Sequence, residues 1–348
     1  MKKELLMATA LVSTLGAASV AQAVTATMSG SMKIGAEFDS PETGTDTQNV
    51  IDLSNFSVSL SETTDGGTTI SSSFGVIDEG ASDIGDDDNA LKLTFTDGSA
   101  LEVLNAGNAL GTHDIAVPGA AGEQGVAGTT TNNAPTGLDF AAPSTALGVE
   151  WHSASDFLMD GLKMSASFST DNGSAKTATA RVESSWGLGA TYVTSAGDTA
   201  LTIGAGVSGS EVANTGTQAR ADDGGFTVGV SAVTGDLTVA VGYADGDTTV
   251  GGSTNQDVDG SVVKAGIKYV SGDITLALGA VSGEAKDGSF GTAGTTDDSH
   301  DEMNASVTYA VASGVSAILG YTNVDQNDEG ASDTTGGSSW YIGATMSF

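Results

Sequence analysis

The chain has 348 residues, with 49 glycines, no cysteine, and 44 acidic against 11 basic side chains, which gives a formal net charge of −33. This acidic balance excludes nucleic acid as a partner, because phosphates require Lys and Arg, and it excludes charge-driven attachment to an anionic lipid surface. A chain without cysteine cannot depend on disulfides for its stability.

Residues 1–23 have the features of a secretory signal peptide. Lys2 and Lys3 form a short basic start, residues 5–20 are mostly apolar or small, and Ala21-Gln22-Ala23 matches an A-x-A cleavage site. The alternative is a transmembrane anchor, but the apolar stretch is short for one and is interrupted by Ser and Thr. We therefore expect export, cleavage after Ala23, and a mature chain that starts at Val24.

The remaining chain contains no apolar run long enough for a membrane helix, which needs about 20 residues. Its mean hydropathy is +0.02. An exported chain of this kind is either a soluble all-β protein or a membrane β-barrel, and the alternation of residues has to decide between them.

The first mature segment alternates with a period of two, which places its two residue sets on opposite faces of a strand. Apolar or small residues occupy the even positions Val24, Ala26, Met28, Gly30, Met32, Ile34, Ala36 and Phe38, and mostly polar residues occupy the odd positions between them. The same pattern recurs at residues 56–60, 91–95, 147–151, 162–168, 186–192, 201–207, 226–232, 237–243, 263–269, 274–280, 305–309 and 315–321, and more weakly at 70–76 and 101–105.

The last segment also alternates, with Trp340, Ile342, Ala344, Met346 and Phe348 on one face. The total is about sixteen strands, and an even number returns the chain to the side where it started. Many apolar-face positions are Ala, Val or Gly, which is thin for the packed core of a β-sandwich but suits a face turned toward lipid. The sequence therefore predicts one domain, residues 24–348, folded as a transmembrane antiparallel β-barrel.

The connections are expected to alternate between tight turns and long polar segments, as in outer-membrane barrels with short periplasmic turns and long outer loops. Gly and Asp mark the tight turns, for example Asp97-Gly98, Gly235-Asp236 and Gly272-Asp273. Long segments lie near residues 40–49, 78–89, 106–144, 171–184, 211–224, 245–260, 285–301 and 325–337, and 106–144 is the longest.

Two other classes of protein are alternatives to the barrel. A secreted or surface adhesin built as a β-solenoid should show a fixed short repeat, but the Gly-Gly pairs at 66–67, 224–225, 251–252 and 336–337 are irregularly spaced. An enzyme is disfavoured because the chain has three histidines, no cysteine and no G-x-S-x-G motif. We expect passive transport and no catalytic residues.

The chain resembles the general-diffusion porins of Gram-negative bacteria, in particular those of alpha-proteobacteria. The resemblance lies in the leader ending Ala21-Gln22-Ala23, the opening strand at 24–30 and the closing strand at 340–348 with its terminal Phe348. It implies an outer-membrane location, passage of small hydrophilic solutes and ions, a homotrimer, and a closing strand read by the outer-membrane assembly machinery. It also implies that a long outer loop folds into the pore.

The resemblance makes segment 106–144 the candidate constriction loop, and a mobile outer loop is the alternative. Its acidic residues Asp114, Glu123 and Asp139 are then expected to face basic residues of the wall. The basic and acidic residues of the polar strand faces are Lys33, Lys92, Lys163, Lys264 and Lys268, and Glu37, Glu102 and Glu150 together with His152. Inward lysines are required in any case, because a Lys facing lipid near the midplane costs about 2–4 kcal/mol. A field across the pore and ordinary solvation of the lumen both remain open.

Further carboxylates cluster in the expected outer loops. They are Asp83, Asp86, Asp87, Asp88, Asp222, Asp223, Asp257, Asp259, Asp297, Asp298, Asp301, Glu302, Asp325, Asp328, Glu329 and Asp333. Such clusters either bind Ca²⁺ or form a solvated surface that resists aggregation. No run has the D-x-D-x-D-G pattern of a calcium loop, so no particular metal site is predicted.

Overall fold

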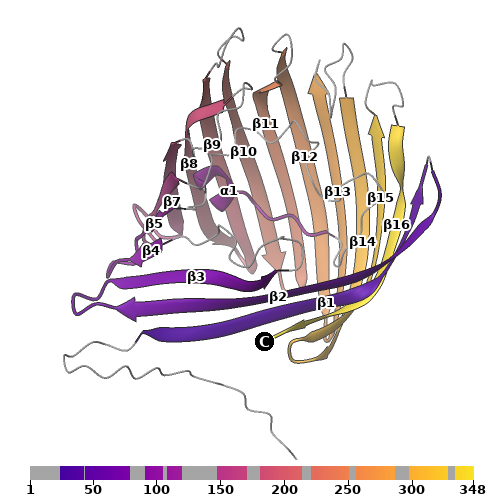
Figure 1. Cartoon of the computed structure of the whole chain (residues 1–348), viewed down its shortest axis with the longest axis horizontal. Coiled ribbons are helices and arrows are strands. Elements are labelled where there is room, and N and C mark those ends of the chain that lie inside the picture. Colours follow the sequence, from indigo (N-terminus) through magenta and orange to yellow (C-terminus); the bar gives the residue numbers. More distant parts are fainter. Residues whose placement is uncertain are drawn as a thin grey trace, which may run out of the picture.

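The computed structural model describes residues 24–42, 44–78, 91–104, 108–119, 147–170, 181–213, 221–250, 256–286, 298–327 and 334–348. Sixteen antiparallel strands form one closed barrel in which each strand pairs with its neighbours in sequence and β1 pairs with β16 (Figure 1). The strands are β1 Thr25–Pro41, β2 Thr47–Thr63, β3 Thr69–Asp78, β4 Leu91–Thr94, β5 Ala100–Val103, β6 Leu147–His152, β7 Leu162–Thr170, β8 Arg181–Ala196, β9 Thr199–Ala213, β10 Ala221–Thr234, β11 Leu237–Val250, β12 Gln256–Ser271, β13 Ile274–Lys286, β14 Asp298–Ala312, β15 Val315–Asn327 and β16 Thr334–Ser347; the helix is α1, Ala109–Thr112.

The seam between the first and last strands closes the sheet. The pairing runs from Ser31 opposite Ser347 to Pro41 opposite Gly337. Beyond it, the backbone groups of Gly30 and Phe348 exchange two hydrogen bonds of 3.2 and 3.1 Å. Closure satisfies the strand edges that an open sheet would leave without partners in a bilayer.

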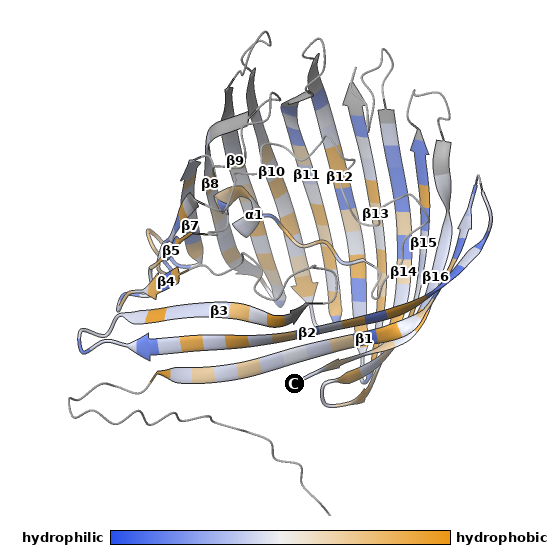
Figure 2. Ribbon diagram, in the orientation of Figure 1, coloured by the Kyte–Doolittle hydropathy of each residue, from blue (hydrophilic) through white to orange (hydrophobic). Residues whose placement is uncertain are grey.

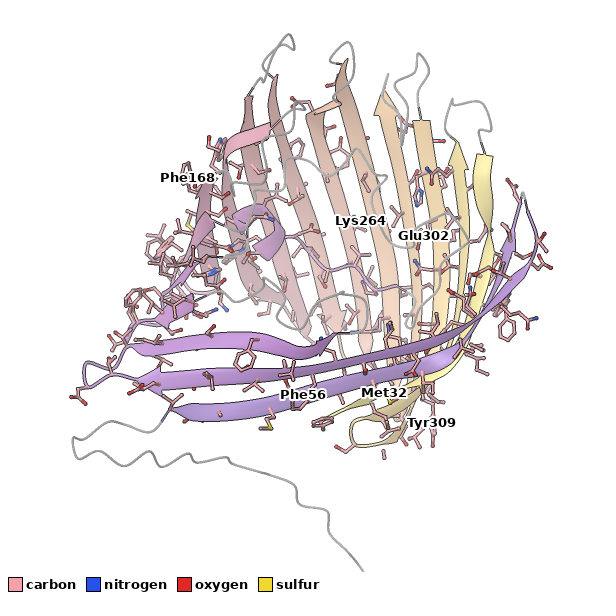
Figure 3. All side chains as sticks on the ribbon, in the orientation of Figure 1. Met32, Phe56, Phe168, Lys264, Glu302 and Tyr309 are labelled. Atoms are coloured by element: carbon pink, nitrogen blue, oxygen red, sulfur yellow. The ribbon has the colours of Figure 1, made fainter. Side chains whose placement is uncertain are left out.

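The barrel is polar inside and apolar outside, as the period-two alternation predicts. Large apolar side chains point away from the wall and are exposed, among them Phe168, Tyr309 and Ile342. Polar side chains of the opposite parity, such as Ser167 and Thr322, are buried on the lumen side. Alternating colours along the strands show the same pattern (Figure 2). The side chains of Phe168 and Tyr309 lie outside the barrel, whereas those of Lys264 and Glu302 lie inside it (Figure 3).

The tight turns follow the sequence prediction, but the strands are longer than predicted on the opposite side. Positive φ angles of 55° and 59° at Gly235 and Gly272 form two of the short hairpins. β11 and β12 pair as far as Val250 opposite Gln256, well into the segment 245–260 that was expected to be loop. The apolar–polar alternation stops where a strand leaves the hydrocarbon, whereas backbone pairing continues, so the sequence pattern underestimates strand length.

The connection between β6 and β7, residues 153–161, departs from the short turns of its side of the barrel. Asp156 has φ +62° and its carboxylate accepts a 2.5 Å hydrogen bond from the backbone N–H of Gly161. Phe157 packs edge-on against Trp151, with their ring centroids 5.5 Å apart. This connection is ordered by its own contacts.

In the part of the chain that the structure describes, no helix has the length and apolar character needed to cross a membrane. The predicted leader at residues 1–23 lies outside the described residues, as do residues 106–107 and 120–144 of the candidate constriction loop, which include Glu123 and Asp139.

Candidate functional site

The described part of the candidate constriction loop, residues 108–119, lies inside the ring of strands. We call it the loop segment. It begins with α1, whose N-terminus is capped by Asn108: the side-chain oxygen accepts a 2.7 Å hydrogen bond from the backbone N–H of Gly111. The cap fixes the start of α1 on the inner wall.

Side chains of three strands anchor the loop segment. The N–H of Ala109 donates to Ser167 of β7 at 3.0 Å, and the hydroxyl of Thr112 donates to Glu150 of β6 at 2.7 Å. His113 is buried and uses both ring nitrogens, with Nδ1 2.6 Å from Thr191 of β8 and Nε2 2.9 Å from Ser165 of β7. These contacts hold α1 against the wall at β6–β8.

Burial of His113 against the wall lowers the pKa of its imidazole below the usual 6.5. Repulsion by His152 and Lys163 acts in the same direction. His113 is therefore neutral near pH 7. It then has one N–H to donate and one lone pair to accept a hydrogen bond, which matches its two hydroxyl neighbours.

A row of inward glycines, which we call the glycine strip, lies beneath the loop segment. Its members are Gly187 and Gly189 of β8, Gly204 and Gly206 of β9, Gly229 of β10, Gly242 of β11, Gly266 of β12 and Gly279 of β13. A methyl group at Gly206 would lie 2.7 Å from the Cα of Leu110, and one at Gly229 would lie 2.7 Å from the Cβ of Ile115. Only a residue without a Cβ lets the loop backbone approach the strand this closely. The glycine strip is therefore the surface on which the loop segment packs.

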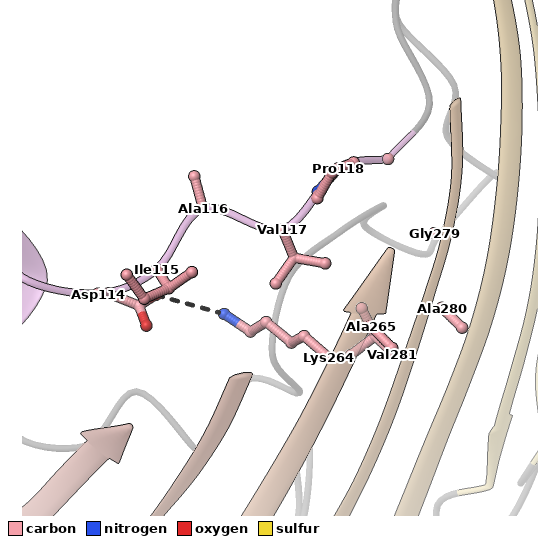
Figure 4. Close-up of a pocket in the computed structure, with 11 residues that line it drawn as sticks. Asp114, Ile115, Ala116, Val117, Pro118, Lys264, Ala265, Gly279, Ala280 and Val281 are labelled. Atoms are coloured by element: carbon pink, nitrogen blue, oxygen red, sulfur yellow. Dashed lines mark ion pairs between the residues drawn. The ribbon is translucent and has the colours of Figure 1, made fainter. Parts of the chain in front are cut away.

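An ion pair joins the loop segment to β12. Asp114 Oδ2 lies 3.9 Å from Lys264 Nζ of β12, and both side chains are about one-third exposed. They border a cavity of about 250 Å³ between the loop segment and β12–β13 (Figure 4). The loop and wall charges thus form an ion pair at the edge of a cavity that can hold several water molecules.

A second charged group lines β4–β6. Lys92 Nζ is 2.7 Å from Glu102 Oε1, and Glu102 lies directly opposite Glu150 in the β5–β6 ladder. His152 shares this face, with Nε2 3.5 Å from Glu102 Oε1. Glu102, Glu150 and His152 are the group of side chains in the described residues that could hold a metal ion.

The remaining predicted wall residues are spread around the lumen. Lys33 has the parity of the buried Glu37 on β1, and Glu37 accepts a 3.4 Å hydrogen bond from Ser339 of β16. Lys163 has the parity of the buried Ser165. Lys268 lies on β12 four residues after Lys264, so both lysines are on the same face of the strand. Lys264 is the wall lysine that the structure pairs with the loop segment in the described residues.

Several acidic residues that the sequence placed in outer loops lie within strands instead: Asp222 and Asp223 in β10, Asp257 and Asp259 in β12, Asp298, Asp301 and Glu302 in β14, and Asp325 in β15. Glu302 was expected in an acidic outer loop, but it lies within β14, is 1% exposed on the lumen face, and accepts a 2.8 Å hydrogen bond from Asn304. Asp301 is also within β14, opposite Asp325 of β15. Polar residues on both faces near the outer end of a strand look like a loop in the sequence, which explains the error.

Sequence reasoning also missed the glycine strip and the role of His113. A signal was present, because each strand from β8 to β13 carries a glycine at an inward position near its middle. These glycines could not be interpreted without knowing which chain segment crosses those strands.

Comparison with known proteins gives a family. Residues 8–329 match the family model of the Gram-negative porins. No protein with a curated description matches the sequence. The barrel is similar to an anion-selective porin from Comamonas acidovorans, with a TM-score of 0.69 and 12% identity over 93% of this chain and 100% of that one.

Two further solved structures share the fold. OmpT of Vibrio cholerae, in a trimer form, has a TM-score of 0.65 and 15% identity over 93% of this chain and 99% of its own. OmpF of Salmonella typhi, in complex with daunomycin, has a TM-score of 0.64 and 15% identity over 93% and 98%. At these identities the structures establish the fold, and the family model, which spans most of the chain, establishes the family. The chain belongs to the Gram-negative porins.

Proposed function

We propose that this porin passes small hydrophilic solutes and ions by diffusion through its lumen in the outer membrane, and that it has no catalytic activity. The observation that carries the proposal is the inverted burial of the barrel. Polar side chains such as Glu150, Ser185 and Thr322 are buried inside, while Phe168, Leu278 and Ile342 are exposed outside. This arrangement suits a wet lumen within lipid. A surface adhesin outside the membrane does not require polar residues inside and apolar residues outside.

We further propose that the loop segment narrows the pore and that Asp114 and Lys264 set a local field there. The segment lies against the wall along the glycine strip, and its carboxylate faces the wall ammonium at 3.9 Å. Opposite charges across a constriction orient dipolar solutes and water and bias which ions pass. Glu123 and Asp139 are expected to add negative charge to the same loop.

The subunits are proposed to form a homotrimer. One solved relative is described in a trimer form. In this chain β4 and β5 have four residues each, a length of about 13 Å, whereas the apolar band of an outer-membrane barrel is about 25 Å tall. A neighbouring subunit covering this low wall would shield it from lipid.

Two further proposals concern the assembly machinery and bound ions. The closing strand with Phe348 is proposed to be read by the outer-membrane assembly machinery, and the 80% exposure of the Phe348 side chain leaves it accessible. The second proposal is that acidic outer loops of this chain bind Ca²⁺. Most of those carboxylates lie outside the described residues or have side chains that are not described.

Planar-bilayer recording in a salt gradient tests the channel and its charge selection together. The purified protein should give discrete conductance steps. Lys264→Ala removes the wall charge beside Asp114 and should shift the reversal potential toward cation preference, and Asp114→Asn should shift it the opposite way. Lys268→Ala, on the same strand face, should give a smaller shift than Lys264→Ala. Absence of steps would refute the channel, and equal reversal potentials in all variants would refute only the proposed field.

A further inference from the structure

Three ligand-type side chains on the lumen face of β5 and β6 converge in a way that diffusion does not require. Glu102 and Glu150 stand directly opposite each other in the β5–β6 ladder, and His152 follows Glu150 on the same face, two residues along. One ligand atom from each of the three lies within 4.8 Å of the other two. The three side chains are therefore close enough for one cation to draw their donor atoms together with small movements.

Two of the donor atoms are buried without a hydrogen-bond partner. Glu150 is 1% exposed, and while its Oε1 accepts from Thr112, its Oε2 has no partner. His152 Nε2 is also buried and unpartnered. A buried carboxylate oxygen and a buried ring nitrogen left in this way cost free energy unless water or an ion supplies the missing partner.

The hydrogen bonds around His152 favour the tautomer that a metal needs. Its Nδ1 lies 3.0 Å from Ser165 Oγ, which lies 2.9 Å from His113 Nε2, and His113 Nδ1 lies 2.6 Å from Thr191 Oγ1. If each Nδ1 carries the proton, His152 donates to Ser165, Ser165 donates to His113, and His113 donates to Thr191.

This assignment satisfies every member of the chain and leaves His152 Nε2 with a free lone pair 3.5 Å from Glu102 Oε1. The reverse assignment would give Nε2–H an acceptor only at 3.5 Å, in Glu102 Oε1, which is longer than a good N–H···O bond. Support of a ligating histidine through its other ring nitrogen is the usual arrangement at metal sites.

The charges select the class of ion. Two carboxylates, a neutral imidazole and Lys92, which contacts Glu102 Oε1 at 2.7 Å, leave an excess of one negative charge that a divalent cation reverses. Ca²⁺ and Mg²⁺ prefer oxygen ligands alone, whereas one imidazole with two carboxylates suits Zn²⁺ and similar first-row ions. We propose that Glu102, Glu150 and His152 form a binding site for a divalent transition-metal ion on the channel wall.

The site has two consequences for the molecule. Three protein ligands leave a coordination position open toward the lumen, which water or a passing solute can take. Glu150 also accepts the Thr112 hydroxyl, so a bound ion would stiffen the point where α1 meets β6. The site does not depend on the proposed conduction, because its ligands bind whether or not solutes pass.

Zinc titration of the folded, chelator-treated protein tests the proposal. Calorimetry in detergent, with excess Ca²⁺ to occupy outer-loop carboxylates, should show one Zn²⁺ per chain, and Co²⁺ should give a visible absorption band typical of nitrogen and oxygen ligands. His152→Gln and Glu150→Gln should weaken Zn²⁺ binding more than tenfold, and Ser165→Ala, which removes the outer support, about tenfold.

The matched control is His300→Gln, because His300 is the other histidine on a described strand and its Nε2 lies 3.8 Å from Glu302. This variant should bind Zn²⁺ as tightly as the unaltered protein. Compact migration of unboiled samples in detergent gels verifies that each variant has folded. Absence of stoichiometric Zn²⁺ binding and of the Co²⁺ band in the unaltered protein would overturn the proposal, as would equal affinity in His152→Gln or an equal loss in His300→Gln.

Discussion

Single atoms of the inner wall decide how closely the loop segment can lie against it. At Gly266 a methyl group would overlap the carbonyl oxygen of Pro118 and would lie 2.9 Å from Cγ1 of Val117. At Gly242, on the neighbouring strand, the nearest atom is Cγ2 of Val117 at 3.9 Å, an ordinary contact distance. Two glycines of one strip therefore have different tolerances for a side chain, and this difference can be measured.

Gly266→Ala should displace the loop segment, while Gly242→Ala should leave it in place. The overlap with backbone at Gly266 is expected to cost about 1–3 kcal/mol. In Gly242→Ala the new methyl group makes only an ordinary contact with Val117 and restricts the unfolded chain, so this variant should be neutral or stabilised by up to about 1 kcal/mol. Denaturant unfolding gives the free energies, and open-channel current noise reports the mobility of the loop segment. Equal stability and equal noise in the two variants would show that the strip does not support the loop.

At the scale of elements, the sequence predicted strands better than it predicted what lies on them. The alternation at 24–39 and 340–348 identified both faces of β1 and β16, because lipid and water impose opposite demands on adjacent residues. The ends of β11 and β12 were missed because beyond the bilayer both faces are polar. The pairing of Asp114 with Lys264 was one of several permitted by parity, since the path of a loop is set by contacts such as the glycine strip and His113, which no local pattern encodes.

The attachment of the loop segment should weaken in acid, because His113 binds a proton less readily when it is held against the wall. Burial lowers its pKa below 6.5, so at lower pH a detached loop takes up a proton that the attached loop resists. The stabilising contribution is therefore complete above about pH 6.5 and is lost as the pH falls toward the lower pKa of the attached state. Open-channel noise should rise between about pH 7 and pH 5.

The non-titrating variant His113→Gln isolates this effect. Its amide can still hydrogen-bond to Ser165 and Thr191, but it takes up no proton, so noise should depend much less on pH in this range. His300→Gln, on the far strand β14, should keep the pH dependence of the unaltered protein. If His113→Gln and the unaltered protein show the same dependence, another group controls the loop.

For the molecule as a whole, stability depends on a bilayer or detergent around the apolar outer face. Adjacent residues of β10 test this directly, because Val230 is exposed on the outside and lies opposite Ile203 and Val241, while Ser231 has the lumen parity of Gly229. Val230→Lys places a charge in the hydrocarbon region and should destabilise the barrel by about 2–4 kcal/mol, whereas Ser231→Lys places the same charge in water and should change stability little. Both substitutions place the same side chain at adjacent positions of one strand, and the strand propensities of the replaced Val and Ser differ by less than about 1 kcal/mol, which is smaller than the expected effect.

Refolding into lipid vesicles, followed by the compact gel mobility of unboiled samples, measures the difference. In vesicles the population of compact barrel should fall for Val230→Lys and stay near that of the unaltered protein for Ser231→Lys. The outward face then behaves as lipid-facing surface and the inward face as channel wall. Equal effects of the two lysines, or a monodisperse folded protein without any amphiphile, would mean that the outer face is not in contact with hydrocarbon.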